Sequence, residues 1–174
     1  MKATPTSLEF FTKKPAARLN FMPITLQELN TYDPYNAYVN LFLNDHFRYN
    51  RLHDKLKGLP NNFSDFLFDL KTAEFIKGRI AVPFNLNQER AQELAIIVLE
   101  LITADWYLGD IVNQIRERGG VEEQKAKTIA GLIVTQLFAP ILEELKKMHI
   151  EKFAKNLPKP NQDMNNRVVN LKNT

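Results

Sequence analysis

Residues 94–118, LAIIVLELITADWYLGDIVNQIRER, decide the fold of this chain. Their apolar side chains recur with the 3.6-residue period of an α-helix, and a pair of glycines follows as a stop signal. The pattern predicts one uninterrupted helix over about 85–118. A second helical pattern runs over about 121–156, so we expect the two to form a long antiparallel hairpin. Pro140 predicts a kink in the second helix, because proline removes a backbone hydrogen bond.

The apolar residues of the first predicted helix cover more than one of its faces. One apolar arc opposes a polar strip, and a second apolar flank contains Leu99, Ile102 and Trp106. A helix of this kind is either central in its own domain or buried by a partner. Central burial is favoured because the other predicted helices need something to pack on. If a partner provides the cover, these three residues form the interaction surface, and another protein or a second copy of this chain, as a homo-oligomer, binds there.

Shorter helical patterns precede the hairpin, over about 35–58 and 64–77. Two helices of 45 Å or more fit poorly into a globule of this size, whose radius of gyration would be about 16 Å. We therefore predict an all-α fold, an elongated bundle of about four main helices. The single helical domain spans 25–156, between an irregular arm over 1–24 and a polar, proline-punctuated tail over 157–174 that we expect to be disordered.

Local signals mark two helix starts near the beginning of the predicted domain. Thr25 and Glu28 have the spacing of a capping box, in which each residue bonds the backbone of the other. Asp33 followed by Pro34 supplies a cap and a first-turn proline. Both pairs predict a helix N-terminus.

Composition excludes several classes of protein. The 174 residues are 44% hydrophobic and 25% charged, which is typical of a globular protein, and they contain no cysteine. Disulfides, thiolate metal sites and cysteine nucleophiles are therefore excluded. The first residues lack the apolar stretch of a secretory signal, and the apolar run over 94–112 carries three acidic residues, too many for a membrane span. We expect a cytoplasmic protein without membrane contact.

Positive charge gathers at the two ends of the chain. The net charge is +3, and residues 1–24 and 143–174 each have three more basic than acidic side chains, whereas the segment between them has three more acidic ones. Basic ends of this kind can neutralise phosphates, so accessory nucleic-acid binding is an alternative function. The candidate residues for this contact are Lys13, Lys14, Arg18, Lys146, Lys147, Lys152 and Lys155.

Two carboxylates occupy positions where the helical pattern expects apolar side chains. Asp45 lies in the apolar arc of the helix predicted over 35–58, and Asp105 lies in that of the helix over 85–118. Because an unpaired buried carboxylate is costly, such acids either belong to functional sites or accept hydrogen bonds from neighbouring helices. We predict both as buried polar positions.

One spacing points to a nuclease. The segment RYNRLH places Arg48 and His53 as R-x4-H. This resembles the signature of HEPN-type ribonucleases, an all-α and often dimeric family. The resemblance implies that the arginine holds a phosphate and that the histidine assists attack by a 2′-hydroxyl. The residue after the arginine is usually Asn, Asp or His in that family, and it is Tyr49 here.

Other signatures of catalysis are missing from the sequence. There is no Glu-x-x-His pair of the kind that holds metals in helical bundles, no glycine-rich phosphate loop and no Gly-x-Ser-x-Gly elbow. We therefore expect no metal and no cofactor. The sequence favours a non-enzymatic helical interaction protein, such as an adaptor, an inhibitor or an assembly subunit.

Overall fold

The computed structural model describes residues 24–154, and every regular element in that range is helical. This confirms the all-α prediction. The predicted tail, nearly all of the predicted arm, and four of the basic candidates lie outside the described residues; these four are Lys13, Lys14, Arg18 and Lys155.

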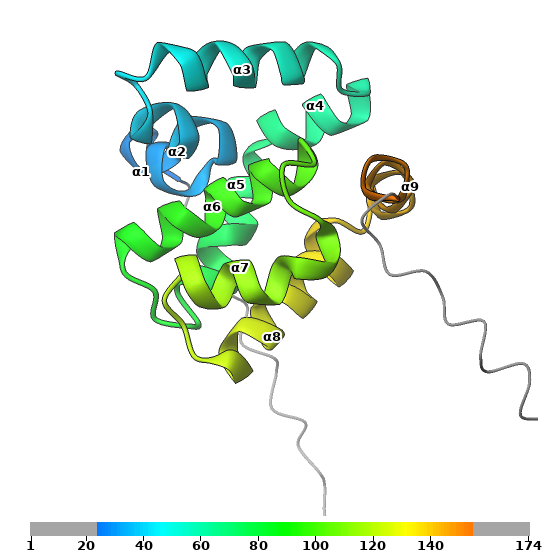
Figure 1. Ribbon diagram of the computed structural model, residues 1–174. Helices are drawn as coiled ribbons and strands as arrows, with labels where there is room; N and C mark the ends of the chain where they lie inside the picture. Colours follow the sequence, from blue (N-terminus) through cyan, green and yellow to red (C-terminus); the bar gives the residue numbers. More distant parts are fainter. Residues whose placement is uncertain (1–23, 155–174) are drawn as a thin grey trace, which may run out of the picture.

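The elements follow one another along the chain in the order of the colours in Figure 1. They are α1 (Leu26–Tyr32), α2 (Pro34–Leu41), α3 (His46–Lys57), α4 (Asn61–Phe68), α5 (Leu70–Phe75), the π-helical turn η1 (Ile76–Ala81), α6 (Gln88–Ile102), the 3₁₀ turn η2 (Leu108–Asp110), α7 (Ile111–Arg118), α8 (Glu123–Leu132), the π-helical turn η3 (Ile133–Leu137) and α9 (Leu142–Phe153).

The predicted helix starts at the beginning of the domain are confirmed. The hydroxyl of Thr25 accepts the backbone N–H of Glu28, and the Glu28 carboxylate accepts the backbone N–H of Thr25 at 2.9 Å. The Asp33 carboxylate caps α2 by accepting the N–H of Asn36 at 2.8 Å, and Pro34 is the first helical residue. Glu28 also pairs with Lys77 at 2.6 Å, which ties α1 to η1 and lowers the pKa of Glu28 to about 2.

Helix α6 lies at the centre of the fold, with α1 and α2 on one flank and α7 on another (Figure 1). Nine of its 15 side chains are buried, and the burial is unbroken from Leu94 to Leu99. Six consecutive buried residues point in every direction around a helix, so α6 is covered on all sides. Leu99 and Ile102 are 0% exposed. The central-burial alternative therefore holds for α6, and the prediction that these two residues form a partner surface is wrong.

The first helix of the predicted hairpin is broken. Helix α6 ends at Ile102 and α7 begins at Ile111, so the prediction of one helix over 85–118 is wrong. The break has the geometry of a Schellman motif: the N–H of Asp105 donates to the Glu100 carbonyl at 2.7 Å, and the N–H of Ala104 donates to the Leu101 carbonyl at 3.0 Å. These bonds satisfy the last carbonyls of α6 and turn the chain out of the helix.

Ala104 holds the left-handed position of this motif, with a φ of +51°. Glycine is the usual residue there, because a Cβ in this conformation costs about 1–2 kcal/mol. The alanine carries no local stop signal, and helical periodicity continues across it. For this reason the break cannot be read from the pattern of residues 94–118.

The side chain of His149, from α9, forms hydrogen bonds with residues on both sides of the break. Its Nδ1 accepts the N–H of Leu108 at 3.0 Å, and its Nε2 lies 2.7 Å from the Leu101 carbonyl, to which it donates. The ring is 1% exposed, and burial lowers the pKa of His149. The neutral ring, protonated on Nε2, is therefore the form that fits.

The second helix of the predicted hairpin is broken as well. Helix α8 continues through η3 to Leu137, and α9 starts at Leu142 after a bend of 115°. Pro140 lies in the connecting segment, so the proline ends the helix where a kink was predicted. With both helices interrupted, the chain does not form the elongated hairpin of about 85–118 and 121–156.

Among residues 24–154, no single helix combines the length and the apolar content needed to cross a membrane. One bent pair, Glu123–Leu137 with Leu142–Phe153, reaches that length and composition when its two parts are taken together. Both parts place side chains in the core, including Ile129 and Leu145, which are 0% exposed.

We expect the free energy of unfolding to fall as the pH drops below about 6.5, the ordinary pKa of histidine. His149 resists protonation in the folded protein but accepts a proton when unfolded, so the unfolded state binds more protons in this range. Protonation of this ring should lower the free energy of unfolding by up to about 1.4 kcal/mol per pH unit. Urea denaturation at pH 7.5 and 5.5 measures this change.

The variant H149F isolates this effect. It should lose about 2 kcal/mol at pH 7.5, because the Leu101 carbonyl and the Leu108 N–H lose their partner, and its stability should depend less on pH. The control H53F removes an exposed histidine and should keep the pH dependence of the native chain. An equally steep pH dependence in H149F would contradict the assignment.

Candidate functional site

The helix expected over 35–58 is interrupted at Asp45. Helix α2 ends at Leu41 and α3 begins at His46, and the Asp45 carboxylate caps α3 by accepting the N–H of Arg48 at 3.0 Å. The side chain of Asp45 is 44% exposed. The prediction of a buried Asp45 is therefore wrong, because the carboxylate serves a helix N-terminus at the surface.

Helix α3 lies across the top of the molecule, over α2 and beside α4 (Figure 1). Leu52 is its one fully buried side chain. The other apolar and aromatic residues of α3 are partly or largely exposed, so most of this helix is surface.

A groove of about 510 Å³ lies between α3 and the segment that follows α6. It is lined by Tyr38, Asp45, Phe47, Arg48, Arg51, Lys55, Glu100, Asp105 and Trp106. A second hollow of about 490 Å³ continues along α3 and shares Phe47, Arg51 and Lys55 with the groove. Four residues singled out from the sequence thus meet here, although they come from separate elements: Asp45, Arg48, Asp105 and Trp106.

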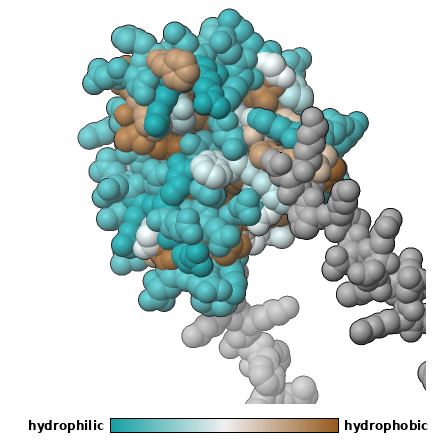
Figure 2. Space-filling model, in the orientation of Figure 1, coloured by the Kyte–Doolittle hydropathy of each residue, from teal (hydrophilic) through white to brown (hydrophobic). Residues whose placement is uncertain are grey.

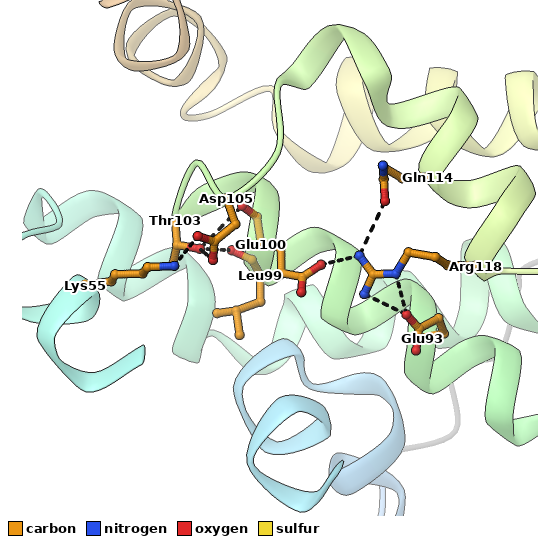
Figure 3. Close-up of polar contacts among 8 residues, drawn as sticks. All are labelled: Lys55, Glu93, Leu99, Glu100, Thr103, Asp105, Gln114 and Arg118. Atoms are coloured by element: carbon orange, nitrogen blue, oxygen red, sulfur yellow. Dashed lines mark hydrogen bonds and ion pairs between the residues drawn. The ribbon is translucent and has the colours of Figure 1, made fainter. Parts of the chain in front are cut away.

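Asp105 is paired across the groove rather than buried. Its carboxylate forms an ion pair with Lys55 of α3 and lies 3.0 Å from the hydroxyl of Thr103 (Figure 3). The side chain of Asp105 is 25% exposed and that of Lys55 is 23% exposed, so the pair is partly desolvated. It links α3 to the break after α6 and leaves the neighbouring Trp106 42% exposed in the groove wall.

Arg118 neutralises Glu100, the second carboxylate that lines the groove. This α7 side chain pairs with both Glu93 and Glu100 of α6, with its Nη2 2.6 Å from a Glu93 oxygen (Figure 3). These carboxylates raise the pKa of Arg118 against the opposing effect of burial. Both charges of α6 that face α7 are thereby neutralised within the chain.

Asp45, the third carboxylate, pairs with Arg48 at 3.3 Å. The Arg48 guanidinium also lies 4.4 Å from the centre of the Phe42 ring, a cation–π contact. Tyr38 also lines the groove, and burial, with the negative charges of Glu100 and Asp105, raises the pKa of its phenol.

Arg51 lines the groove and the second hollow, and no carboxylate among residues 24–154 forms an ion pair with it. Its side chain is exposed on the outer part of α3. Among the described residues, the unpaired charge of the groove is therefore the positive charge of Arg51.

Exposed apolar side chains gather where α2 meets α3. Leu41 is 50% exposed, Leu43 is 63% exposed and Phe47 is 76% exposed, and we call these three residues the α2–α3 corner. Figure 2 shows brown apolar side chains in the upper left of this face, and further brown side chains lie on its right side and near its lower end. Phe47 belongs both to the corner and to the groove.

The structure does not bring Arg48 and His53 together as a catalytic pair. Five residues apart on one α-helix, their side chains leave the axis about 140° apart. Arg48 lines the groove and is paired with Asp45, while His53 is exposed and lines neither hollow. In the part of the chain that the structure describes, no three His, Asp or Glu side chains gather as a metal site.

Two of the basic candidates on α9 have partners within the chain. Lys146 pairs with Glu143 at 2.8 Å, and Lys152 donates to the Thr103 carbonyl at 3.4 Å. Lys147 is exposed on the same helix. Nucleic-acid binding by the basic ends stays a prediction, since the remaining candidates lie outside residues 24–154.

Sequence reasoning missed the corner and Arg51. The helix predicted over 35–58 ran through this region without a break, so the end of α2 at Leu41 and the exposure of these residues were not foreseen. The available signal was Asp45, a residue type that is common at helix N-caps and that caps α3 here.

We expect R118M to lower the free energy of unfolding by about 2 kcal/mol, because it leaves Glu93 and Glu100 without a cation in a partly buried site. The matched control is R116M on the same helix. Among residues 24–154, Arg116 pairs with the neighbouring Glu117 alone, and both are exposed, so this change should cost less than about 0.5 kcal/mol. Urea denaturation followed by circular dichroism measures both, and equal losses would contradict the structural role of Arg118.

In comparisons with known proteins, no family model, no curated protein and no solved structure matches this chain. Arguments about function therefore rest on the groove, the α2–α3 corner and the chemistry of their side chains.

Proposed function

We propose that this chain is a non-enzymatic interaction protein, an adaptor, inhibitor or assembly subunit, that docks onto another protein through the α2–α3 corner and the adjoining groove. The observation that carries the proposal is the exposure of Leu41, Leu43 and Phe47 at the corner, with Phe47 and Trp106 also lining the groove. Clustered exposed apolar side chains of this kind, bordered by charged residues, are typical of protein interaction sites.

The energetics favour a macromolecular partner for this surface. Fully burying a phenylalanine or leucine side chain contributes about 1.5–3 kcal/mol, and aromatic residues and arginine dominate the binding energy of interfaces. The surface offers Phe47 and Trp106 as aromatic anchors, with Arg51 between charged neighbours.

The paired charges support binding rather than catalysis. Each carboxylate of the groove already has a cation: Asp45 has Arg48, Asp105 has Lys55, and Glu100 has Arg118. A general acid or base needs a group that is free to exchange its proton with a substrate. The groove carboxylates are instead held as fixed charges, and the Asp105–Lys55 pair links α3 to the segment that follows α6.

The test compares the native chain with the double variant L43E/F47E, which places charges in the corner. The control V82E/I150E introduces the same charges at two other exposed apolar residues, directly after η1 and on α9, that line neither hollow. Tagged full-length proteins are used to capture partners from native lysate for quantitative mass spectrometry, and sedimentation velocity over a range of concentrations measures self-association. Circular dichroism verifies that each variant is folded.

We expect at least one partner, or self-association of the chain, to be lost tenfold or more in L43E/F47E and kept in V82E/I150E. The physical reason is that charges buried against a partner cost several kcal/mol unless they are compensated. The proposal fails if the native chain is monomeric at all concentrations and no captured protein depends on the corner.

A further inference from the structure

We infer that the partner segment recognised here is an acidic and apolar peptide, whose carboxylate binds Arg51 and whose bulky apolar side chains cover Phe47 and Trp106. This inference rests on the proposed function and names the chemistry of the partner. It is carried by the charge balance of the groove and by the place of Arg51 within it.

The charge balance follows from the ion pairs. Of the acidic and basic side chains that line the groove, all but one are engaged with an opposite charge of the chain, and Arg51 is the exception among the described residues. A partner that brings a carboxylate therefore meets a cation without having to displace an existing pair.

Arg51 is also placed to receive a side chain from an elongated ligand. It lines both hollows along α3, and Phe47 lines both as well. A segment that runs along α3 would therefore pass an aromatic anchor and a guanidinium in both hollows. Arginine binds carboxylates through two parallel hydrogen bonds. Arg51 therefore favours an aspartate or glutamate of the ligand over an uncharged polar side chain.

The helix that forms the outer wall adds to this preference. Helix α3 carries four basic residues and one acidic residue, and most of its side chains are exposed. Its potential attracts acidic segments and repels basic ones, which affects both the rate and the specificity of encounter.

A nucleic acid fits the same surface less well. A single strand presents a phosphate at every nucleotide and needs a row of available cations along its path. Here Asp45, Glu100 and Asp105 line the groove, and two of the three basic side chains that line it are already paired with carboxylates. One unpaired arginine beside aromatic rings matches an isolated carboxylate among apolar residues better than it matches a polyanion.

Trp106 makes the inference directly measurable. It is the single tryptophan of the chain and lies in the groove wall, so intrinsic fluorescence of the full-length protein reports occupancy there. The probes are a 12-residue peptide that alternates glutamate with leucine or phenylalanine, the matched peptide with lysine in place of glutamate, and a 15-nucleotide oligo(dT).

We expect the acidic peptide to shift the Trp106 emission to shorter wavelength and to bind at least tenfold more tightly than the lysine peptide and the oligo(dT). R51E should weaken binding of the acidic peptide by tenfold or more and strengthen binding of the lysine peptide. The control R79E makes the same charge change at an exposed arginine that lines neither hollow, and binding should stay within twofold of the native value. F47A should weaken the binding of both peptides without changing which of them binds more tightly.

The inference is overturned if the lysine peptide or the oligo(dT) binds at least as tightly as the acidic peptide, if R51E and R79E behave alike, or if a second copy of the chain is what shifts the emission. Should no acidic peptide bind while corner-dependent capture persists, the inference falls and the proposed function stands. If the corner-dependent capture is also absent, both fall.

Discussion

The burial of α6 on every side is the constraint on which the rest of the structure depends. A helix with unbroken burial from Leu94 to Leu99 can continue only as far as neighbouring elements cover it. Fifteen residues correspond to about 22 Å, which is the scale of a compact domain rather than of an extended hairpin. The chain must leave the helix at this point, and it does so at Thr103.

The exit from α6 creates the groove. Ala104 adopts a conformation that is costly for a residue with a Cβ, and the surrounding contacts maintain it: the buried His149 holds both sides of the break, and Lys55 holds Asp105. The result is a short segment that places Trp106 opposite α3. A structural device that ends a helix thus also positions the aromatic side chain of the binding surface.

The electrostatics of the groove arise from pairs between distant parts of the chain. Lys55 and Asp105 are 50 residues apart, and Arg118 reaches back to Glu93 and Glu100. Considered alone, each carboxylate of the groove is a candidate general acid, general base or metal ligand. In the folded chain, each one is neutralised by a paired cation. The chemistry of the site is therefore defined by the charge that remains, that of Arg51.

The sequence alone determined the helical class and the helix signals that act locally. The capping box of Thr25 and the Asp33-Pro34 start depend on bonds within a few residues, so they can be read from a short window. Only the tertiary structure decided that the helix ends at Ile102, that Asp45 caps a separate helix, and which charges pair. Periodicity records that a residue is apolar without recording what covers it, and these outcomes depend on contacts that cross the whole fold.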